Sequence, residues 1–297
     1  MSAPQGFSFH TCDVFTERRF GGNQLAVVPD ARGLSDQQMQ AIACEFNYSE
    51  TTFVLPPSDP RHAARVRIFT PGRELPFAGH PTVGTAYVLA SRIPELARAE
   101  RIVLEEGVGP VTVDLERDGA QLTRCIFTAP RLPQIGPKPP RRDDLAAMLG
   151  LPASQLLDSA EFWSCGMEFL VIPLTSVDAL QRCRLDMTVW AGLLGGYQSK
   201  HVYPVARAEA AWRVRMFAPD AGVPEDPATG SAAAAFAGWL AAYAPEASSR
   251  SEVTLLQGEE IGRPSRIDLQ IDRAGDRVLA VRVGGASVMV SQGTLLV

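Results

Sequence analysis

The stretch PTVGTA at Pro81–Ala86 recurs in the second half of the chain as PATGSA at Pro227–Ala232, an offset of 146 residues (227 − 81). Two further stretches recur in the same order: RIFTP at Arg67–Pro71 returns as RMFAP at Arg215–Pro219, and GNQLAVVP at Gly22–Pro29 returns as GMEFLVIP at Gly166–Pro173. Their offsets are 148 (215 − 67) and 144 (166 − 22) residues. Ordered matches at nearly one offset indicate a duplicated structural unit. The sequence therefore predicts two similar halves.

Each half combines short strands with one helix that is apolar on every face. Runs of β-branched residues cut by Pro and Gly are typical of strands, and in the first half they lie at residues 25–28, 52–55, 65–69, 101–104, 110–115 and 121–127. The segments Thr82–Ser91 and Ala228–Tyr243 are apolar all round, and such a helix must be surrounded by other elements. We predict an α+β protein with two pseudo-symmetric domains, each a curved mixed β-sheet wrapped around a central helix.

A proline-rich stretch, Arg131–Arg142, separates the two halves and is typical of a connection between domains. We place the first domain at residues 1–130 and the second at residues 131–285. The last segment, Val278–Val297, has the pattern of strands, and its end at 286–297 is expected to return to the first domain. Two amphipathic helices are predicted outside the central ones, at Ser35–Phe46 with a capping box, and at Asp143–Leu149.

Composition excludes several classes of function. The chain has 297 residues, of which 46% are hydrophobic and 21% charged, with a net charge of −5. Its cations are scattered, which argues against nucleic acid as a partner. Met1–Phe9 has no basic or apolar region of the kind found in secretory signals, so we expect a cytoplasmic protein. The uncharged run between Asp226 and Glu246 is short for a membrane span and indicates a buried helix. Five cysteines and four histidines at wide spacing predict neither a metal site nor disulfides.

The two central helices are expected to begin near Gly79-His80-Pro81-Thr82 and near Glu225–Gly230, since proline suits the first helical position. If the pseudo-twofold axis brings these N-termini together, free backbone N–H groups and two positive dipole ends converge on one point. Such a point binds an anion without a basic side chain, and a substrate carboxylate is the expected occupant. Gly79, Gly84 and Gly230 would let the backbone approach it closely.

Polar side chains are unusually dense around these helix starts. His80 and Asp226 fall at matched repeat positions, with Thr85 and Ser231 one turn further along. Each could be structural, because Asp226 and Thr82 are suitable caps and His80 could be a hydrogen-bonded buried imidazole. Their occurrence at matched positions favours a functional site over that simpler interpretation.

A further candidate is Glu50, which lies in the segment Asn47–Thr52 at the entrance of a predicted strand. A glutamate there is most often a solvated surface charge. A carboxylic acid held against apolar walls instead has its pKa raised toward neutrality, and it can then carry a proton to and from carbon. We therefore include Glu50 as a candidate proton carrier.

These segments together resemble the phenazine-biosynthesis PhzF-like family. The resemblance rests on DVFT at Asp13–Thr16, GNQLAV at Gly22–Val27, NYSET at Asn47–Thr51, LPFAGHPT at Leu75–Thr82 and EDPATGS at Glu225–Ser231, and it extends over essentially the whole chain. It implies a diaminopimelate-epimerase-like fold and cofactor-independent proton chemistry in a cleft between two domains.

The resemblance also implies roles for individual residues. In the phenazine enzyme, the family's glutamate takes a proton from C3 of 2,3-dihydro-3-hydroxyanthranilate and returns it to the ring; Glu50 matches it. The catalytic residues implied are Glu50, Asp226 and His80, and the substrate-binding residues are Gly79, Gly230 and Ser231. No cofactor and no metal is implied.

Alternative functions remain open at the level of the sequence. One is an amino-acid epimerase or racemase, although epimerases of this fold carry a cysteine at each helix start and none occurs here at the matching positions. The other is a non-catalytic binding protein that keeps the fold. The expected partners are a small carboxylate substrate and, by family resemblance and the base rate for cytosolic enzymes, a second copy of the chain in a homodimer.

Overall fold

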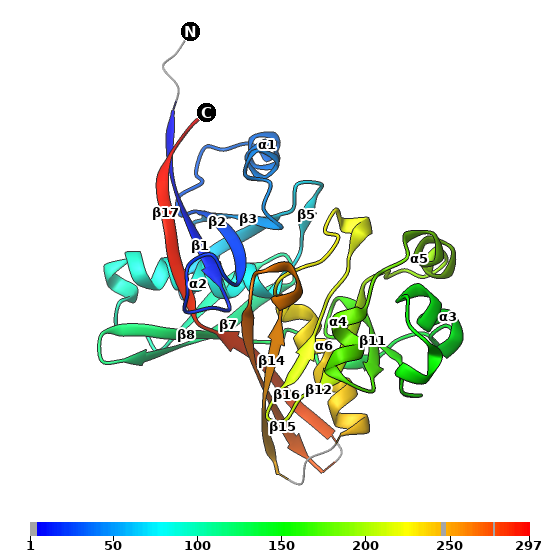
Figure 1. Ribbon diagram of the computed structural model, residues 1–297. Helices are drawn as coiled ribbons and strands as arrows, with labels where there is room; N and C mark the ends of the chain where they lie inside the picture. Colours follow the sequence, from blue (N-terminus) through cyan, green and yellow to red (C-terminus); the bar gives the residue numbers. More distant parts are fainter. Residues whose placement is uncertain (1–4, 245–247, 276) are drawn as a thin grey trace. The chain divides into compact units, whose positions relative to one another are not determined.

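The computed structural model describes residues 5–244, 248–275 and 277–297 (Figure 1). Residues 1–4 of the segment Met1–Phe9, and residues 245–247 at the end of the uncharged run, lie outside this part of the chain. The chain divides into two compact units: unit 1 is Met1–Pro130 with Val283–Val297, and unit 2 is Arg131–Arg282. Within the described residues, no helix is long and apolar enough to cross a membrane.

Unit 1 is a mixed sheet around one helix. Its elements are β1 (Gly6–Val14), β2 (Asn23–Val28), α1 (Asp36–Phe46), β3 (Glu50–Leu55), β4 (Ala64–Phe69), β5 (Glu74–Leu75), α2 (Gly79–Arg92), β6 (Arg101–Glu106), β7 (Gly109–Asp118), β8 (Gln121–Thr128) and β17 (Ser287–Leu296), with a short 3₁₀ turn at Pro94–Leu96. β2 is parallel to β3 and β4 is parallel to β6, whereas the other pairs, β1–β2, β3–β4, β4–β5, β6–β7 and β7–β8, are antiparallel.

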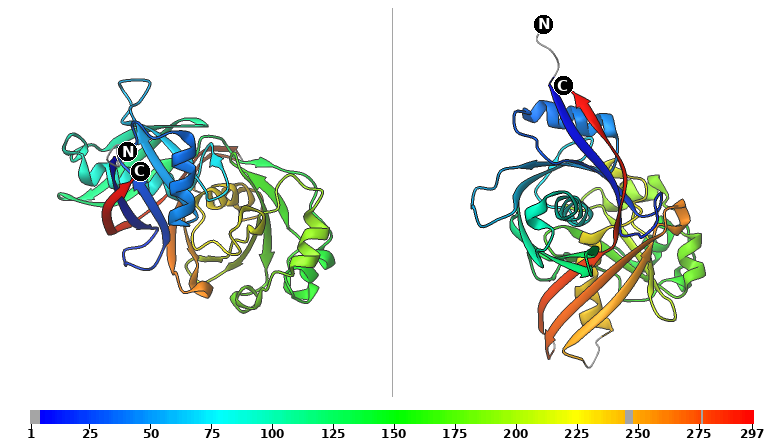
Figure 2. Two further views of the ribbon diagram at one scale, coloured as in Figure 1. Left: turned by 90° about the horizontal axis from the view of Figure 1, so that it is seen from above. Right: turned by 90° about the vertical axis from the view of Figure 1, so that its left-hand side faces the viewer.

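The helix α2 is the centre of unit 1. It packs against β1, β2, β3, β6, β7, β8 and β17, and Figure 2 shows it almost end-on with strands around it in the right-hand view. Eleven of its 14 residues are buried. A helix without a solvated face agrees with the sequence prediction for this segment.

The end of the chain closes the sheet of unit 1. β17 pairs antiparallel with β1 along its length, from Gly6↔Leu296 to Val14↔Ser287. Just before it, the end of β16 (Arg277–Gly285) pairs with β8. Gly284 permits this contact, because a Cβ there would lie 2.5 Å from the carbonyl oxygen of Cys125. The strands thus form a ring around α2.

Unit 2 repeats the same pattern of pairing. Its elements are β9 (Gln134–Ile135), α3 (Arg142–Met148), β10 (Glu161–Ser164), β11 (Glu168–Leu174), α4 (Val177–Arg182), α5 (Met187–Leu194), β12 (Val202–Arg207), β13 (Trp212–Val214), α6 (Gly230–Tyr243), β14 (Arg250–Gln257), β15 (Ser265–Ala274) and the first part of β16, with 3₁₀ turns at Ala153–Gln155, Pro219–Ala221 and Glu259–Ile261. β11 is parallel to β12 and β13 to β14, and the remaining described pairs are antiparallel. The central helix α6 packs against β9, β10, β11 and β15.

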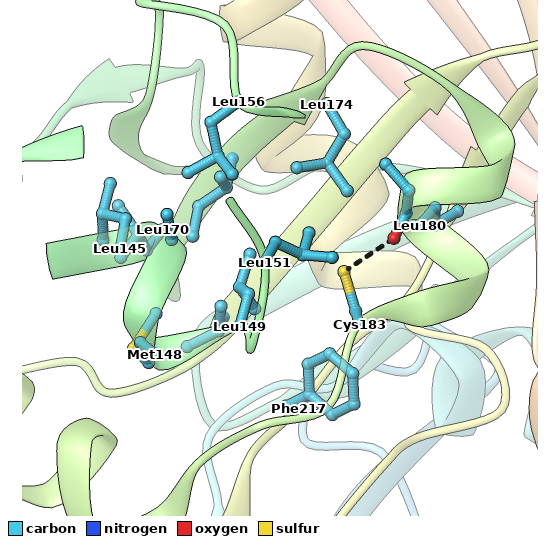
Figure 3. Packing of buried hydrophobic residues seen from close by; sticks show 14 of the residues in the cluster. Leu145, Met148, Leu149, Leu151, Leu156, Leu170, Leu174, Leu180, Cys183 and Phe217 are labelled. Carbon is cyan, nitrogen blue, oxygen red and sulfur yellow. Dashed lines mark hydrogen bonds between the residues drawn. The ribbon is translucent and has the colours of Figure 1, made fainter. Parts of the chain in front are cut away.

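Smaller helices cover a second core in each unit. In unit 1, α1 buries Met39 and Ile42 against Val28, Phe53 and Phe69, and it begins with the predicted capping box between Ser35 and Gln38. In unit 2, side chains of α3, α4 and α5 pack with those of β10, β11 and β12. Figure 3 shows the part of this core formed by α3, α4 and β11. α3 starts and ends one residue earlier than predicted.

The two central helices are matched at an offset that differs from the predicted one. Both have 14 residues, and they start at Gly79 and Gly230, which are 151 residues apart (230 − 79). Pro81 is the third residue of α2 and Pro227 precedes α6 by three residues, so the prediction that both prolines begin a helix is wrong. Proline is tolerated at the third position because the first helical N–H groups have no intrahelical acceptor.

Candidate active site

Glu50 is placed by a left-handed turn at the end of α1. Asn47 ends that helix with φ at 52°, and its N–H donates to the carbonyl of Ala43. Asparagine adopts this conformation more readily than most residues. Three residues later Glu50 begins β3, opposite Leu25 on the parallel strand β2. The turn thus delivers a partly buried carboxyl, 16% exposed, to the end of two parallel strands.

His80, the second residue of α2, contacts this carboxyl. Its Nδ1 lies 3.5 Å from Oε2 of Glu50, and its Nε2 lies 3.2 Å from the carbonyl oxygen of Gln24. The imidazole is 4% exposed. Burial lowers the pKa of His80 to about 3, and the Gln24 carbonyl opposes this only in part. His80 is therefore neutral at physiological pH.

The hydrogen bond to Gln24 decides the tautomer of His80. A carbonyl oxygen can only accept, so the proton of the neutral imidazole is on Nε2. The lone pair on Nδ1 then faces the carboxyl of Glu50. Nδ1 of His80 and a carboxylate oxygen of Glu50 are both acceptors, and they attract each other only when a proton lies between them. The two side chains are therefore complementary when they share one transferable proton in addition to the proton on Nε2. This is the arrangement that an acid–base catalyst needs.

The first turn of α2 offers backbone donors next to this pair. Ala78 stands at the N-cap and makes no side-chain cap, and the first intrahelical bond is that of the Thr82 N–H to the Ala78 carbonyl. The N–H groups of Gly79 and His80 precede that bond, and both residues are buried. Uncapped N–H groups at a helix N-terminus carry partial positive charge and favour an anion.

Gly84 serves a different purpose from the predicted one. A Cβ at this position would lie 2.5 Å from Leu25 Cδ2 and 2.7 Å from Val14 Cγ2. Gly84 is therefore required for α2 to pack against β1 and β2, not for the approach of a ligand. A hydrogen bond of 2.8 Å between the hydroxyls of Thr52 and Thr85 further fixes α2 against β3.

In unit 2, Asp226 lies in a buried loop just before α6. The hydroxyl of Thr229 donates to its Oδ2 over 2.5 Å, and its own N–H donates to the Met216 carbonyl. Asp226 is 5% exposed. It does not cap α6, because the N-cap is Thr229 and no side chain caps the helix. The expectation that Asp226 and His80 are matched is wrong: at the offset of 151, His80 matches Ser231 and Asp226 matches Leu75.

Gln257 at the end of β14 holds the Asp226 loop. Its Nε2 donates to the Asp226 carbonyl over 2.8 Å and to the Thr229 hydroxyl over 3.0 Å, and its Oε1 accepts from the Thr229 N–H over 3.2 Å. The side chain is 1% exposed. Both protons of the amide and one lone pair of its oxygen are thus used to fix the backbone on which Asp226 and α6 depend.

The first turn of α6 resembles that of α2. The first intrahelical bond is that of the Ala233 N–H to the Thr229 carbonyl. The N–H groups of Gly230 and Ser231 precede it, and Ser231 is 8% exposed. No cysteine occurs at either helix start.

The predicted residues thus fall into two groups. Glu50, Gly79 and His80 lie together in unit 1, and Asp226, Gly230 and Ser231 lie together in unit 2. Sequence reasoning missed the residues that hold these groups: Gln24, Thr229, Gln257 and Glu106. The sequence does contain a signal for Glu106 and Gln257. A Pro-x-x-Gly motif starts at Pro76 and again at Pro227, and each residue lies 30 positions after the proline of its motif and directly before a glycine (106 − 76 and 257 − 227).

A neutral histidine lies against a carboxyl in unit 1, and the central helix of each unit begins with uncapped N–H groups. Such groups are suited to acid–base chemistry and to anion binding, the features of a cofactor-free enzyme site. A profile of the family described as phenazine biosynthesis-like protein matches residues 12–293. The chain belongs to this family, and its expected α+β fold of the diaminopimelate-epimerase type is confirmed.

Individual relatives support the same assignment. The chain is 43% identical over 296 residues to an uncharacterized isomerase of Mesorhizobium japonicum, covering 96% of this chain and 97% of that one. It is 38% identical to trans-2,3-dihydro-3-hydroxyanthranilate isomerase of Pseudomonas aeruginosa, covering 95% and 96%. A crystal structure of a PhzF-family phenazine biosynthesis protein of Bacillus anthracis superposes with a TM-score of 0.88 at 26% identity, covering 99% and 100%. The protein is an isomerase of this family.

Proposed function

We propose that the protein is a cofactor-independent isomerase that moves a proton between two carbons of a small carboxylate metabolite, as in trans-2,3-dihydro-3-hydroxyanthranilate isomerase. The observation that carries the proposal is the contact of 3.5 Å between His80 Nδ1 and Glu50 Oε2, with His80 buried and neutral. This contact places a neutral hydrogen-bond acceptor beside the Glu50 carboxyl, so that Glu50 can hold the transferred proton without a fixed charge next to it.

The reaction conserves all atoms of the substrate. Glu50 takes the proton of one C–H bond while the electrons of that bond form a new C=C bond. The former double bond shifts, and a carbon at the other end of the conjugated system receives the proton from Glu50. His80 orients the Glu50 carboxyl throughout, because its own ring is fixed by the Gln24 carbonyl.

Substrate binding falls to the helix N-termini. We assign the substrate carboxylate to the backbone N–H groups at the start of α2, with Gly79 as the first donor. The backbone N–H of Gly230 and the Ser231 hydroxyl, at the start of α6, are assigned to substrate binding as well. Asp226 accepts a hydrogen bond from a polar group of the substrate and so fixes its orientation. In this assignment the developing negative charge on the substrate is stabilised by backbone dipoles rather than by a basic side chain.

The proposal is tested by turnover and deuterium exchange with wild type and Glu50→Gln. The substrates are a panel of dihydroaromatic and amino-acid carboxylates that includes trans-2,3-dihydro-3-hydroxyanthranilate, in deuterated water, with mass detection. We expect wild type to incorporate deuterium with migration of the double bond, and Glu50→Gln to lose at least about 10²–10⁴-fold in kcat with nearly unchanged substrate affinity.

Glu45→Gln is the matched control, because Glu45 is exposed on α1. The two variants remove the same charge five residues apart. A Glu50→Gln enzyme with full activity would contradict the proton route. Deuterium at a stereocentre without double-bond migration would instead assign an epimerase.

Two wider aspects belong to the same proposal. We propose a homodimer in the cytoplasm with no nucleic-acid or membrane partner. Light scattering after size-exclusion chromatography measures the mass of the assembly, and a value equal to one 32.0 kDa chain would contradict the dimer.

A further inference from the structure

A second buried carboxyl lies behind the first turn of α2. Glu106 is the last residue of β6 and is 7% exposed. Its Oε1 lies 2.7 Å from the hydroxyl of Thr82, and its Oε2 is buried without a hydrogen-bond partner among the described residues. The proposed reaction does not use this group. An ionised carboxylate in such a place would lack most of the hydrogen bonds that a buried charge requires.

Counting protons around Thr82 identifies the form of Glu106. The Thr82 hydroxyl lies 2.8 Å from the Ala78 carbonyl and 2.7 Å from Glu106 Oε1. It has one proton, so it cannot donate to both. If Glu106 is protonated, it donates to Thr82 Oγ1, and Thr82 donates to Ala78. Glu106 Oε1, Thr82 Oγ1 and the Ala78 carbonyl oxygen then each have a suitable partner, and Oε2 is left as a neutral carbonyl oxygen rather than a buried charge. Burial acts in the same direction, because it raises the pKa of Glu106 to about 8.

The repeat provides an internal comparison. At the offset of 151, Glu106 matches Gln257, and the neighbouring glycines match as well. Gly107 allows close approach of Pro76, and Gly258 allows close approach of Pro227, since a Cβ would lie 2.8 Å and 2.6 Å from backbone atoms of these prolines. Gln257 donates to a threonine hydroxyl at the start of α6. Unit 2 therefore places a permanently neutral donor where unit 1 has Glu106.

Charged side chains around Glu106 have other partners. Arg67 of β4 pairs with Asp36 of α1 and Glu74 of β5, and Glu105 accepts from His62 and from the N–H groups of Ser58 and Asp59. Arg65 of β4 is exposed, and the buried His80 of α2 is neutral. Opposite Glu106 on β7 stands Gly109. No ion pair within the described residues offsets a charge on Glu106.

We propose that Glu106 is a positioning residue that acts in its protonated form, holding the start of α2 through Thr82, and that its ionisation at alkaline pH weakens the binding of the anionic substrate. An ionised Glu106 interacts with the same positive end of α2 that would receive the substrate carboxylate. The effect on substrate rests on the proposed function, whereas the protonation of Glu106 does not.

The first test measures protonation without substrate. Difference infrared spectroscopy of wild type against Glu106→Gln should show the carbonyl band of a protonated carboxyl at pH 7, which disappears with rising pH around 8. Glu95→Gln, on an exposed turn, should leave that band in place. A carboxylate band for Glu106 at pH 7 would overturn the proposal, whatever the enzyme's reaction.

The second test follows the kinetics against pH. We expect the KM of wild type to rise about fivefold from pH 8 to pH 9, as for a site that binds only with Glu106 protonated, and kcat to change much less. The KM of Glu106→Gln should stay flat over that range. Equal pH profiles of KM in wild type and Glu106→Gln would refute the positioning role of Glu106. If wild type shows the infrared band but turns over none of the substrates tested, the proposed function is refuted and the protonation of Glu106 is not.

Discussion

Replacing Gln257 by Leu should destabilise the loop that holds Asp226 and should reduce activity. The change preserves most of the side-chain volume but removes three hydrogen bonds at once. It leaves the Thr229 N–H and the Asp226 carbonyl buried without their partner. The Thr229 hydroxyl keeps its bond to Asp226 Oδ2.

The magnitude follows from these two orphaned backbone groups. An unsatisfied buried donor or acceptor costs about 1–3 kcal/mol, so the two together cost about 2–6 kcal/mol. The larger apolar surface of leucine, buried where Gln257 is only 1% exposed, offsets about 1–2 kcal/mol. We expect a net loss of about 1–4 kcal/mol in the free energy of unfolding, a large part of an ordinary total of about 5–15 kcal/mol.

Urea unfolding followed by circular dichroism and by tryptophan fluorescence measures this loss as a shift of the midpoint. Gln181→Leu is the control, because Gln181 is exposed on α4, and it should change stability by less than about 0.5 kcal/mol. If Gln257→Leu is equally mild, the hydrogen bonds of Gln257 do not hold this loop and the reasoning is wrong.

The remaining predictions concern packing and ionisation in unit 1. Gly84→Val should destabilise the protein by about 1–3 kcal/mol, because its Cβ would overlap Leu25 and Val14. Gly192→Ala, in open space on α5, should instead raise stability by about 0.4–1 kcal/mol. Thermal unfolding measures both variants, and equal midpoints would contradict the overlap at Gly84. His80 should show no protonation by NMR between pH 8 and pH 4, since its pKa is lowered to about 3. In the unfolded state His80 has an ordinary pKa near 6.5 and binds a proton that the native state does not bind. His80 should therefore lower the free energy of unfolding as the pH drops from about 6.5 to 3, by at most roughly 5 kcal/mol. A His80 that titrates near pH 6.5 would contradict its buried, neutral state.

The architecture of this chain could be predicted because duplication and amphipathicity are visible in the sequence. Both central helices are apolar all round. The bounds of α2 and α6 agree with the predicted segments, Thr82–Ser91 and Ala228–Tyr243, to within three residues at each end. The strand at Leu25–Val28 and the capping box at Ser35 were predictable for the same reason, because local patterns of side chains determine them.

The register of the repeat could not be predicted in the same way. The matched letters PTVGTA and PATGSA suggested one alignment, whereas the folded chain aligns Pro76 with Pro227 and Gly79 with Gly230. The chain from the matched phenylalanine to the start of the central helix is three residues shorter in unit 1 than in unit 2, since Phe69 and Phe217 are 148 apart and the helix starts are 151 apart. Residue identity in a short loop is a weak constraint, while close packing of Gly107 and Gly258 against backbone is a strong one.

The candidate site shows the same division. Glu50 and His80 could be named from sequence, but their contact depends on a left-handed Asn47 and on the pairing of β2 with β3, which bring segments 30 residues apart together. Gln257 and Glu106 had no local pattern of catalytic type. Their importance follows from burial and from the count of hydrogen-bond donors and acceptors, which only the folded chain provides.

The closing strand β17 has a consequence for the order in which the protein folds during synthesis. Residues 131–282 form a contiguous unit, whereas the first 130 residues need the last 15, residues 283–297, to complete their ring. The register Gly6↔Leu296 joins nearly the two ends of the chain, a contact of very high sequence separation. On the ribosome, unit 2 can finish first, while this edge of β1 stays unpaired until residues 287–296 have been made. Chaperones that shield exposed strand edges would therefore act on the sheet of residues 1–130, which only the much later residues 283–297 complete.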